Sequence, residues 1–267
     1  MNKIAFIGAG NMASAIVGGI LSSGLTSAEN IILYDNNANQ YNRFNPNCYQ
    51  AQNIQEAVCM SDFVFISVKP QVAKAVLLEI QDTSCYKNKT FISICAGITI
   101  SSIESYLKDA KIIRAMPNTP LLIGHGVTAL CRNEKVENSD FDFIKNVFSS
   151  SGFVSTIDES DMNNVTAITG SSPAYAYLFI KSIYESAKKL GFNYDETIQM
   201  ICKTVIGASQ MILNSSSSID ELIQMVKSPN GTTEKALNVL NDNDFESIIH
   251  KAMDACAKRA EELSKSI

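Results

Sequence analysis

The sequence predicts an α/β fold with a doubly wound parallel sheet, followed by an all-helical C-terminal domain. Two observations support this prediction. In the first half of the chain, short apolar runs alternate with helix-like stretches in the order expected of βαβ units. After about residue 158 the strand signal stops, and apolar residues recur at the spacings of a helix.

Seven strands are expected, and they are rich in β-branched or aromatic residues. Nearly continuous hydrophobicity is typical of parallel strands that are covered on both faces. The first five strands are 3–7, 30–34, 63–68, 90–94 and 111–115, with helices between them at 11–23, 54–60, 71–80 and 101–107. Two further strands, at 126–130 and 152–156, flank a helix near 141–148.

The second half is expected to be a helical domain. A long helix over 161–189 contains Thr169-Gly-Ser-Ser-Pro173, where the proline removes a backbone hydrogen bond and bends the helix. Apolar spacing predicts two more helices around 198–212 and 245–263, and the four serines at 215–218 are expected to form a loop. We therefore divide the chain into one domain at 1–157 and a second at 158–267.

Composition narrows the choice of partners and of location. The net charge of -5 argues against nucleic acid or an anionic membrane as a partner. The uncharged stretch 4–28 contains five glycines, so a buried strand and helix explain it better than a membrane span. The seven cysteines are scattered and form no CxxC pair, which predicts reduced thiols and a cytoplasmic protein. The two histidines lie far apart, so no metal site is expected.

A GxGxxA motif, Gly8-Ala-Gly10-Asn-Met-Ala13, follows the first strand directly and opens into a helix. Gly8 permits the tight turn, Gly10 lets a pyrophosphate approach the backbone, and Ala13 allows close packing of helix on strand. The second strand ends at Asp35, whose carboxylate would accept from an adenosine ribose 2′-hydroxyl and repel a 2′-phosphate. The alternative is a tight turn without a ligand. The order of strand, turn, helix, strand and acid favours a Rossmann-type dinucleotide site.

Two further segments end predicted strands at the edge where open parallel sheets bind their ligands. In Ser67–Pro70, Lys69 is either a catalytic residue or a solvated charge held by the turn, and its spacing alone favours the second interpretation. In Cys95–Gly97, Cys95 is expected to be a small packing residue, because no basic group is visible that would lower its pKa.

In the helical half, Ser228-Pro-Asn-Gly231-Thr232-Thr233 leads into a short helix from Glu234. Free N–H groups and hydroxyls there would form a cradle for a carboxylate or phosphate. An ordinary Pro-Asn-Gly turn with a threonine cap explains the same residues at least as well. The kink at 169–173 also has two interpretations that the sequence supports equally: a packing feature, or a place where a ligand approaches.

No Ser-His-Asp set, catalytic carboxylate pair or ligand cluster can be assembled from the sequence, so histidine-based acid–base chemistry is not expected. A reduction in which a nicotinamide supplies the hydride to an already positively charged substrate would need little from protein side chains.

Several segments together resemble one family, the pyrroline-5-carboxylate reductases of proline biosynthesis. They are Ile7-Gly-Ala-Gly-Asn-Met-Ala13, Ser67-Val-Lys-Pro70, Ala96-Gly-Ile-Thr-Ile-Ser-Ser-Ile103, Ile113-Arg-Ala-Met-Pro-Asn-Thr-Pro120, Thr169-Gly-Ser-Ser-Pro-Ala-Tyr175 and Ser228-Pro-Asn-Gly-Thr-Thr233. The GxGxxA turn is shared by many enzymes, whereas the last three segments in this order are specific. The resemblance runs from end to end of the chain.

The resemblance implies reduction of 1-pyrroline-5-carboxylate to L-proline with NADPH or NADH, by a homodimer or a dimer-based assembly. Thr233 would hydrogen-bond the substrate ring nitrogen, and the N–H groups of Gly231, Thr232 and Thr233 would hold its carboxylate. The implied cofactor contacts are Ile7, Gly8, Ala9, Gly10, Asn11, Met12, Asp35, Asn37, Asn53, Ser67, Val68, Lys69, Pro70, Cys95, Ala96 and Gly97.

Two positions depart from the family's usual pattern, since Ser172 and Asn230 stand where it has glycines. Asn tolerates positive φ, so Asn230 is compatible with the turn, whereas Ser172 adds bulk beside the implied site. Two alternatives stay open at this stage. One is another imine or β-hydroxyacid reductase of the same architecture, and the other is a non-catalytic dinucleotide sensor.

Overall fold

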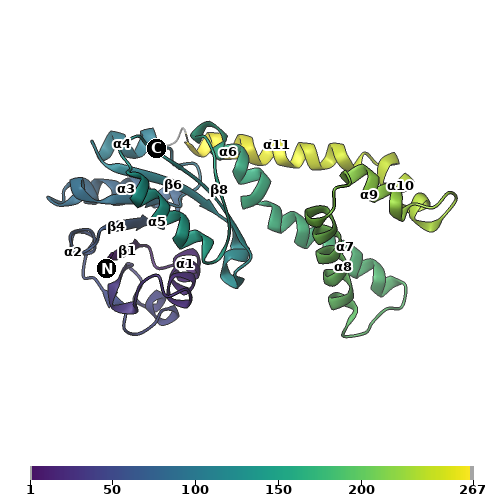
Figure 1. Cartoon of the computed structure of the whole chain (residues 1–267), viewed down its shortest axis with the longest axis horizontal. Coiled ribbons are helices and arrows are strands. Elements are labelled where there is room, and N and C mark those ends of the chain that lie inside the picture. The colour runs from purple at the N-terminus through teal and green to yellow at the C-terminus, as the bar shows by residue number, and fades with distance from the viewer. Residues whose placement is uncertain (1, 265–267) are drawn as a thin grey trace. The chain divides into compact units, whose positions relative to one another are not determined.

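The computed structural model describes residues 2–264, which fall into two compact units (Figure 1). The first comprises residues 2–173 together with 255–264, and it contains the sheet. The second comprises residues 174–254 and is entirely helical. The predicted boundary between 157 and 158 falls just after the last strand, whereas the division into compact units falls at Pro173.

The sheet has the order β3-β2-β1-β4-β5-β6-β7-β8, and all neighbours are parallel except β6 and β7. The chain reverses its direction of winding between β1 and β4, which is the topological switch point of a doubly wound sheet. The strands are β1 (Ile4–Ile7), β2 (Ile31–Tyr34), β3 (Tyr49–Gln50), β4 (Phe63–Ile66), β5 (Thr90–Ser93), β6 (Lys111–Pro117), β7 (Gly126–Arg132) and β8 (Gly152–Thr156). The predicted fold class is confirmed.

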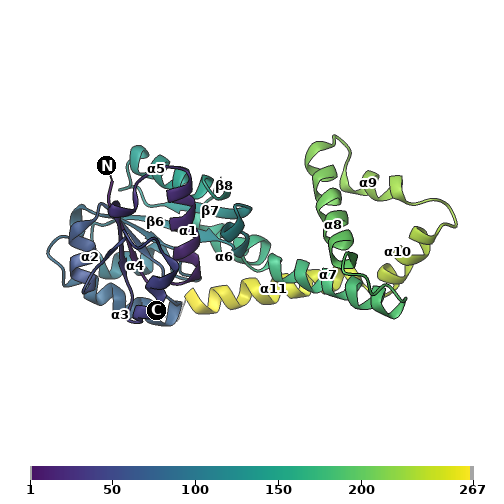
Figure 2. The ribbon, with the colours of Figure 1, turned by 90° about the horizontal axis from the view of Figure 1, so that it is seen from below.

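Helices cover both faces of the sheet, as the continuous apolar strands require (Figure 2). One core lies under α1 (Asn11–Ser22) and α5 (Asn138–Ser149), and the Phe6 and Phe65 rings stack there with centroids 4.5 Å apart. The other core lies under α2 (Ile54–Met60), α3 (Pro70–Gln81) and α4 (Ile100–Tyr106). All seven predicted strands form. The short β3 was missed because two exposed residues, Tyr49 and Gln50, are too few to show a strand pattern.

The helix predicted over 161–189 is interrupted ahead of Pro173, by a π-helical turn. The chain passes through η5 (Glu159–Asp161), α6 (Met162–Val165) and the π-helix η6 (Thr166–Gly170) before α7 (Ser172–Lys189). Pro173 has no N–H for the carbonyl of Thr169, four residues earlier. The buried Asn118 side chain donates to that carbonyl instead, at 3.1 Å. Residues from the end of β6 therefore complete the turn.

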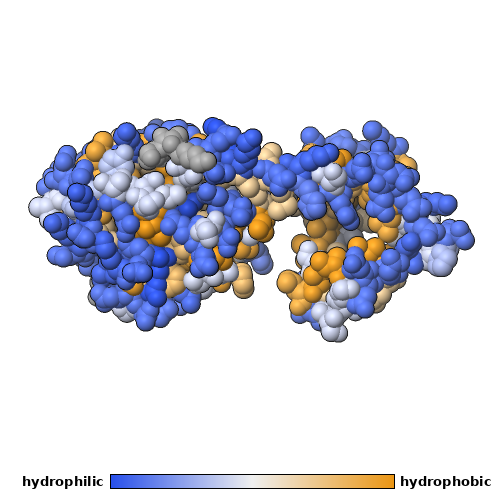
Figure 3. All heavy atoms as spheres, turned by 90° about the horizontal axis from the view of Figure 1, so that it is seen from above, coloured by the Kyte–Doolittle hydropathy of each residue, from blue (hydrophilic) through white to orange (hydrophobic). Residues whose placement is uncertain are grey.

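The helical unit has almost no core of its own. It contains most of α7 and of α11 (Phe245–Ser264), together with α8 (Thr197–Asn214), α9 (Ile219–Val226) and α10 (Thr232–Asp242). Within residues 174–254, Thr197 is the single buried residue, while large apolar side chains such as Leu213 and Met225 are more than 70% exposed. Figure 3 shows this apolar surface in orange on the helical unit. Within residues 2–264, no helix is both long and apolar enough to cross a membrane.

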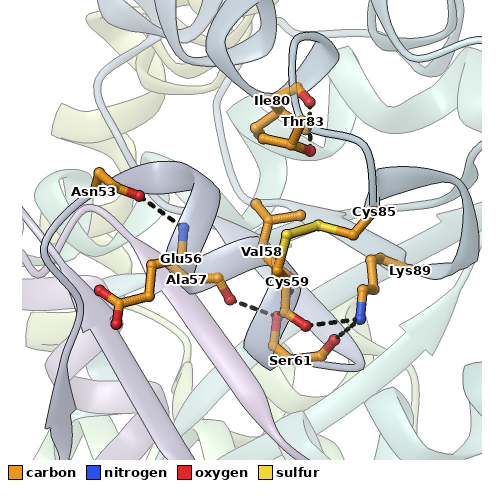
Figure 4. Close-up of a disulfide and its surroundings, with 10 residues drawn as sticks. All are labelled: Asn53, Glu56, Ala57, Val58, Cys59, Ser61, Ile80, Thr83, Cys85 and Lys89. Carbon is orange, nitrogen blue, oxygen red and sulfur yellow. Dashed lines mark hydrogen bonds between the residues drawn. A yellow bond between two sulfur atoms is a disulfide. The ribbon is translucent and has the colours of Figure 1, made fainter.

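One prediction about the cysteines is wrong, because Cys59 and Cys85 form a disulfide (Figure 4). Cys59 lies in α2, and Cys85 precedes β5 in the connection from α3. Their Cα atoms are 5.4 Å apart, within the range that a disulfide spans. A separation of 26 residues along the chain gave no signal of this proximity. The other five cysteines are free.

We expect reduction of the Cys59–Cys85 disulfide to lower the free energy of unfolding by about 3.5 kcal/mol, since a loop closed across 26 residues restricts the unfolded chain. Urea denaturation with and without dithiothreitol measures this difference. The double variant Cys59→Ser, Cys85→Ser should match the reduced protein and should not respond to dithiothreitol. Equal stability of the oxidised and reduced protein would contradict the expectation.

We also expect the full-length chain to be a homo-oligomer, because the helical unit leaves its apolar side chains uncovered within one subunit. Sedimentation velocity at micromolar concentration measures the assembly. A stable monomer under those conditions would contradict this expectation.

Candidate functional site

The glycine-rich turn after β1 is shaped by close contact with the end of β4. Gly8 has φ +98°, and a Cβ added to it would lie 2.6 Å from the carbonyl oxygen of Ser67. Only glycine fits this position. The Ser67 hydroxyl in turn donates to the carbonyls of Ile7 and Gly8, at 3.0 and 2.6 Å. The loops after β1 and β4 are thus fixed to each other.

Gly10, unlike Gly8, faces open space: no atom lies within 4 Å of the place that a Cβ on Gly10 would occupy. Gly10 is the N-cap of α1, and Asn11 and Met12 are the first residues of that helix. The backbone N–H groups of this first turn have no intrahelical partners. Open space beside the start of a twelve-residue helix fits the approach of a phosphate group, as the motif predicts.

Asp35 holds the glycine-rich turn by hydrogen bonds that the sequence did not indicate. Its Oδ2 accepts from the backbone N–H of Ala9 at 2.8 Å, and its Oδ1 accepts from that of Asn37 at 2.9 Å. The Tyr41 hydroxyl bonds both backbone groups of Asp35, accepting from its N–H and donating to its carbonyl. The carboxylate therefore links the turn after β1 to the loop after β2.

A cavity of about 360 Å³ lies at this edge of the sheet and brings seven of the predicted residues together. They are Ile7, Gly8, Gly10, Asp35, Ser67, Val68 and Lys69. Sequence reasoning missed Asn36, Gln40 and Glu79 in the lining. The position of Asn36 directly after Asp35 could have indicated it, whereas Gln40 in η2 (Ala38–Arg43) and Glu79 in α3 belong to no motif.

The cavity carries more negative than positive charge, because Asp35 and Glu79 line it beside Lys69. Tyr34 lies at the end of β2, and the pKa of its phenol is raised. Burial is the main cause, and the charges of Glu79, Tyr41 and Asp35 add to it. Negative charge at this end of the cavity opposes a further anionic group there.

The other predicted cofactor residues do not line this cavity. Asn37 and Asn53 are helix N-caps, whose side-chain oxygens accept from Asn39 and Glu56 N–H groups at 3.1 and 2.8 Å. Pro70 occupies the first turn of α3. Ala9, Asn11 and Met12 belong to the glycine-rich turn and to α1, and Cys95, Ala96 and Gly97 follow β5.

The segment after β5 is buried under the end of the last helix. Burial raises the pKa of Cys95 to about 11, and its thiol donates to the Val68 carbonyl at 3.2 Å, so it is a packing residue as expected. Gly97 has φ +77°, and an added Cβ would lie 2.9 Å from Cβ of Leu263 in α11. The close approach that requires glycine at 97 is therefore made by the chain itself.

In the helical unit, Ser228–Gly231 forms a tight turn that leads into α10. The Gly231 N–H donates to the Ser228 carbonyl at 2.9 Å, and Asn230 has φ +55°. Proline followed by a residue of positive φ matches a type II turn, so Asn230 fulfils the role expected of it. A side chain at 231 would collide with Ser228. Gly231 is the N-cap of α10, and Thr232 is its first residue.

Two charged residues frame this turn, and sequence reasoning missed them both. Glu234 accepts from the Asn230 N–H at 2.8 Å, and Lys227 Nζ lies 3.4 Å from its other oxygen. Thr233 lines a separate, mainly apolar cavity of about 350 Å³ with residues of α8 and α9, among them Met211 and Leu222. The turn thus combines N–H groups suited to an anion with a hydroxyl beside an apolar space.

The described residues contain two arrangements suited to anions, one in each unit, and within residues 2–264 no group of three or more metal-ligating side chains comes together. The turn after β1 has the features of a dinucleotide site. The turn before α10 has the features of a site for a small carboxylate or phosphate.

Comparison with known proteins identifies the chain. Residues 159–263 match the family profile described as pyrroline-5-carboxylate reductase dimerisation, and residues 3–97 match NADP oxidoreductase coenzyme F420-dependent. A crystal structure of a Plasmodium falciparum pyrroline carboxylate reductase with NADP bound superposes with a TM-score of 0.92 at 30% identity, covering 98% of both chains. A solved structure of a pyrroline-5-carboxylate reductase from Coxiella burnetii gives a TM-score of 0.88 at 33% identity, covering 99% of both chains.

A sequence relative gives the same answer over the full length. The pyrroline-5-carboxylate reductase of Escherichia coli (strain K12) is 36% identical, and the match covers 99% of each chain. With 36% identity to this relative over 99% of both chains, and with the fold of two solved family members, the chain belongs to the pyrroline-5-carboxylate reductase family.

Proposed function

We propose that this chain reduces 1-pyrroline-5-carboxylate to L-proline with NADH or NADPH, the last step of proline biosynthesis. The observation that carries the proposal is the coexistence, in a member of this family, of the open glycine-rich turn at Gly10 and the Ser228–Thr233 turn at the start of α10. The first turn suits a pyrophosphate and the second suits a carboxylate.

The dinucleotide is held by the turn after β1 and by the segments that follow the neighbouring strands. The open space at Gly10 and the forced turn at Gly8 fit its pyrophosphate. When bound, its nicotinamide supplies the hydride. The residues proposed to contact it are Ile7, Gly8, Ala9, Gly10, Asn11, Met12, Asp35, Asn37, Asn53, Ser67, Val68, Lys69, Pro70, Cys95, Ala96 and Gly97.

The substrate is held by the turn before α10. The Gly231 N–H donates to the Ser228 carbonyl and holds the turn, so the backbone N–H groups of Thr232 and Thr233 bind the carboxylate, and the Thr233 hydroxyl bonds the ring nitrogen. The protonated imine already carries a positive charge, so the chain's contribution is to fix the ring in the orientation that hydride transfer needs. No general acid or base among the side chains of this turn is required.

We propose a cytoplasmic homo-oligomer that associates through the helical unit. The acidic composition and the five free cysteines support the location, and the exposed apolar side chains of residues 174–254 support the association. In that compartment the Cys59–Cys85 disulfide is open to thiol reductants, since Cys59 is exposed.

The direct test is oxidation of NADH and NADPH, followed at 340 nm, with 1-pyrroline-5-carboxylate as substrate. Proline must appear in an amount equal to the dinucleotide oxidised. Failure to oxidise either dinucleotide with this substrate would reject the proposed function.

We expect Thr233→Ala to lower kcat with 1-pyrroline-5-carboxylate by roughly tenfold to a hundredfold, because one orienting hydrogen bond is lost. Thr233→Ser keeps the hydroxyl and should retain most of the activity. Dinucleotide affinity, measured by fluorescence titration, should barely change in either variant. If Thr233→Ala abolished dinucleotide binding and left kcat/KM for the imine untouched, the turn would not be the substrate site.

We expect wild-type protein to favour NADH over NADPH, because Asp35 and Glu79 both place negative charge at the cavity. Asp35→Asn should move the ratio of kcat/KM values towards NADPH, by about tenfold for each ~1.4 kcal/mol of repulsion removed. This variant should also weaken the binding of both NADH and NADPH, since Asp35 accepts hydrogen bonds from the backbone N–H groups of Ala9 and Asn37. Glu79→Gln is the matched control for affinity: it should shift the ratio of kcat/KM values towards NADPH without weakening the binding of both dinucleotides. An unchanged ratio in both variants would show that neither carboxylate faces the ribose.

A further inference from the structure

The turn proposed to bind the substrate carboxylate depends on a carboxylate of the protein itself. Glu234 lies in the first turn of α10, and its Oε2 accepts from the N–H of Asn230 at 2.8 Å. Asn230 is the residue with φ +55°, a conformation that costs free energy in any residue other than glycine. The bond to Glu234 stabilises that conformation and so fixes the direction of the N–H groups that follow it.

This arrangement creates an electrostatic conflict. A carboxylate at 234 is three residues from Gly231, in the same turn as the N–H groups that would receive a second carboxylate. Two like charges held in one turn repel each other. A protein anion that supports an anion site therefore needs a cation beside it.

Lys227 supplies that cation from the other side of the turn. Its Nζ lies 3.4 Å from Oε1 of Glu234, the oxygen that does not bond Asn230. The two side chains are only 30% and 24% exposed, so their interaction is less screened by solvent than that of a freely solvated pair. Glu234 thus uses one oxygen for the turn and the other for the lysine.

We propose that Lys227 is a specificity-determining residue for the substrate carboxylate: it cancels the charge of Glu234, so that the Gly231–Thr233 turn accepts an anion. This inference rests on the proposed function. Glu234 is a positioning residue, since it acts through the backbone of Asn230. Lys227 and Glu234 are both partly exposed and belong to no core, so loss of Lys227 should alter carboxylate binding without unfolding the helical unit.

The test compares four variants of the full-length protein. Lys227→Met removes the cation and leaves the charge of Glu234 uncompensated. Glu234→Gln keeps an oxygen for the Asn230 N–H and removes the anion. The third variant combines both changes. Lys235→Met, the matched control, removes a lysine next to Glu234 on the exposed face of the same turn.

Steady-state kinetics are measured at saturating dinucleotide with 1-pyrroline-5-carboxylate and with 1-pyrroline, the same cyclic imine without the carboxylate. Lys227→Met should raise KM for 1-pyrroline-5-carboxylate by roughly tenfold with little change in kcat, since repulsion acts on binding. The double variant should return KM to within about threefold of wild type, and Glu234→Gln alone should not raise KM. Lys235→Met should stay within about twofold of wild type. With 1-pyrroline, Lys227→Met should behave as wild type.

Two outcomes would overturn the inference. The first is a double variant as impaired as Lys227→Met, which would make the lysine a structural residue or a direct ligand. The second is an equal increase in KM of Lys227→Met with 1-pyrroline, which would show that the effect does not depend on the substrate carboxylate. The double variant decides the matter by itself if 1-pyrroline reacts too slowly to measure. Wild-type protein that does not reduce 1-pyrroline-5-carboxylate would instead reject the proposed function.

Discussion

The contact between Gly8 and Ser67 is the constraint on which the nucleotide-binding edge depends. β1 and β4 are neighbours at the switch point of the sheet, so the loops that leave them must diverge within a few ångströms. An added Cβ at Gly8 would lie 2.6 Å from the Ser67 carbonyl, which leaves glycine as the single solution. The Ser67 hydroxyl then fixes the two loops together, and the cavity forms between them and the end of β2.

A second constraint acts on the helical unit, whose apolar side chains are hardly buried within one subunit. Helices normally gain stability by burying an apolar face, yet within residues 174–254 only Thr197 is buried. Side chains such as Leu213 and Met225 stay in contact with water in the isolated subunit. The thermodynamic cost of that exposure explains why this segment corresponds to the family's dimerisation region.

The sequence was informative wherever one residue type satisfies a local requirement. Gly8, Gly10 and Ala13 predicted the turn and the first helix, and Pro173 predicted an irregularity in the helix over 161–189. It was silent where the requirement is met by residues distant along the chain. The Asn118 side chain that bonds the Thr169 carbonyl, the partners of Asp35 and the Cys59–Cys85 disulfide all join separated segments. Each is a product of the fold, so no local pattern could indicate it.

Both turns that are suited to an anion are held by an acidic side chain. Asp35 bonds the N–H of Ala9 in the turn after β1, and Glu234 bonds the N–H of Asn230 in the turn before α10. A carboxylate is the strongest acceptor available for a backbone N–H, but its charge opposes the ligand. At the first turn, Lys69 lines the same cavity as Asp35 and Glu79. At the second turn, Lys227 lies 3.4 Å from the other oxygen of Glu234, and this cation offsets the charge that would otherwise oppose an anion at the N–H groups of Thr232 and Thr233.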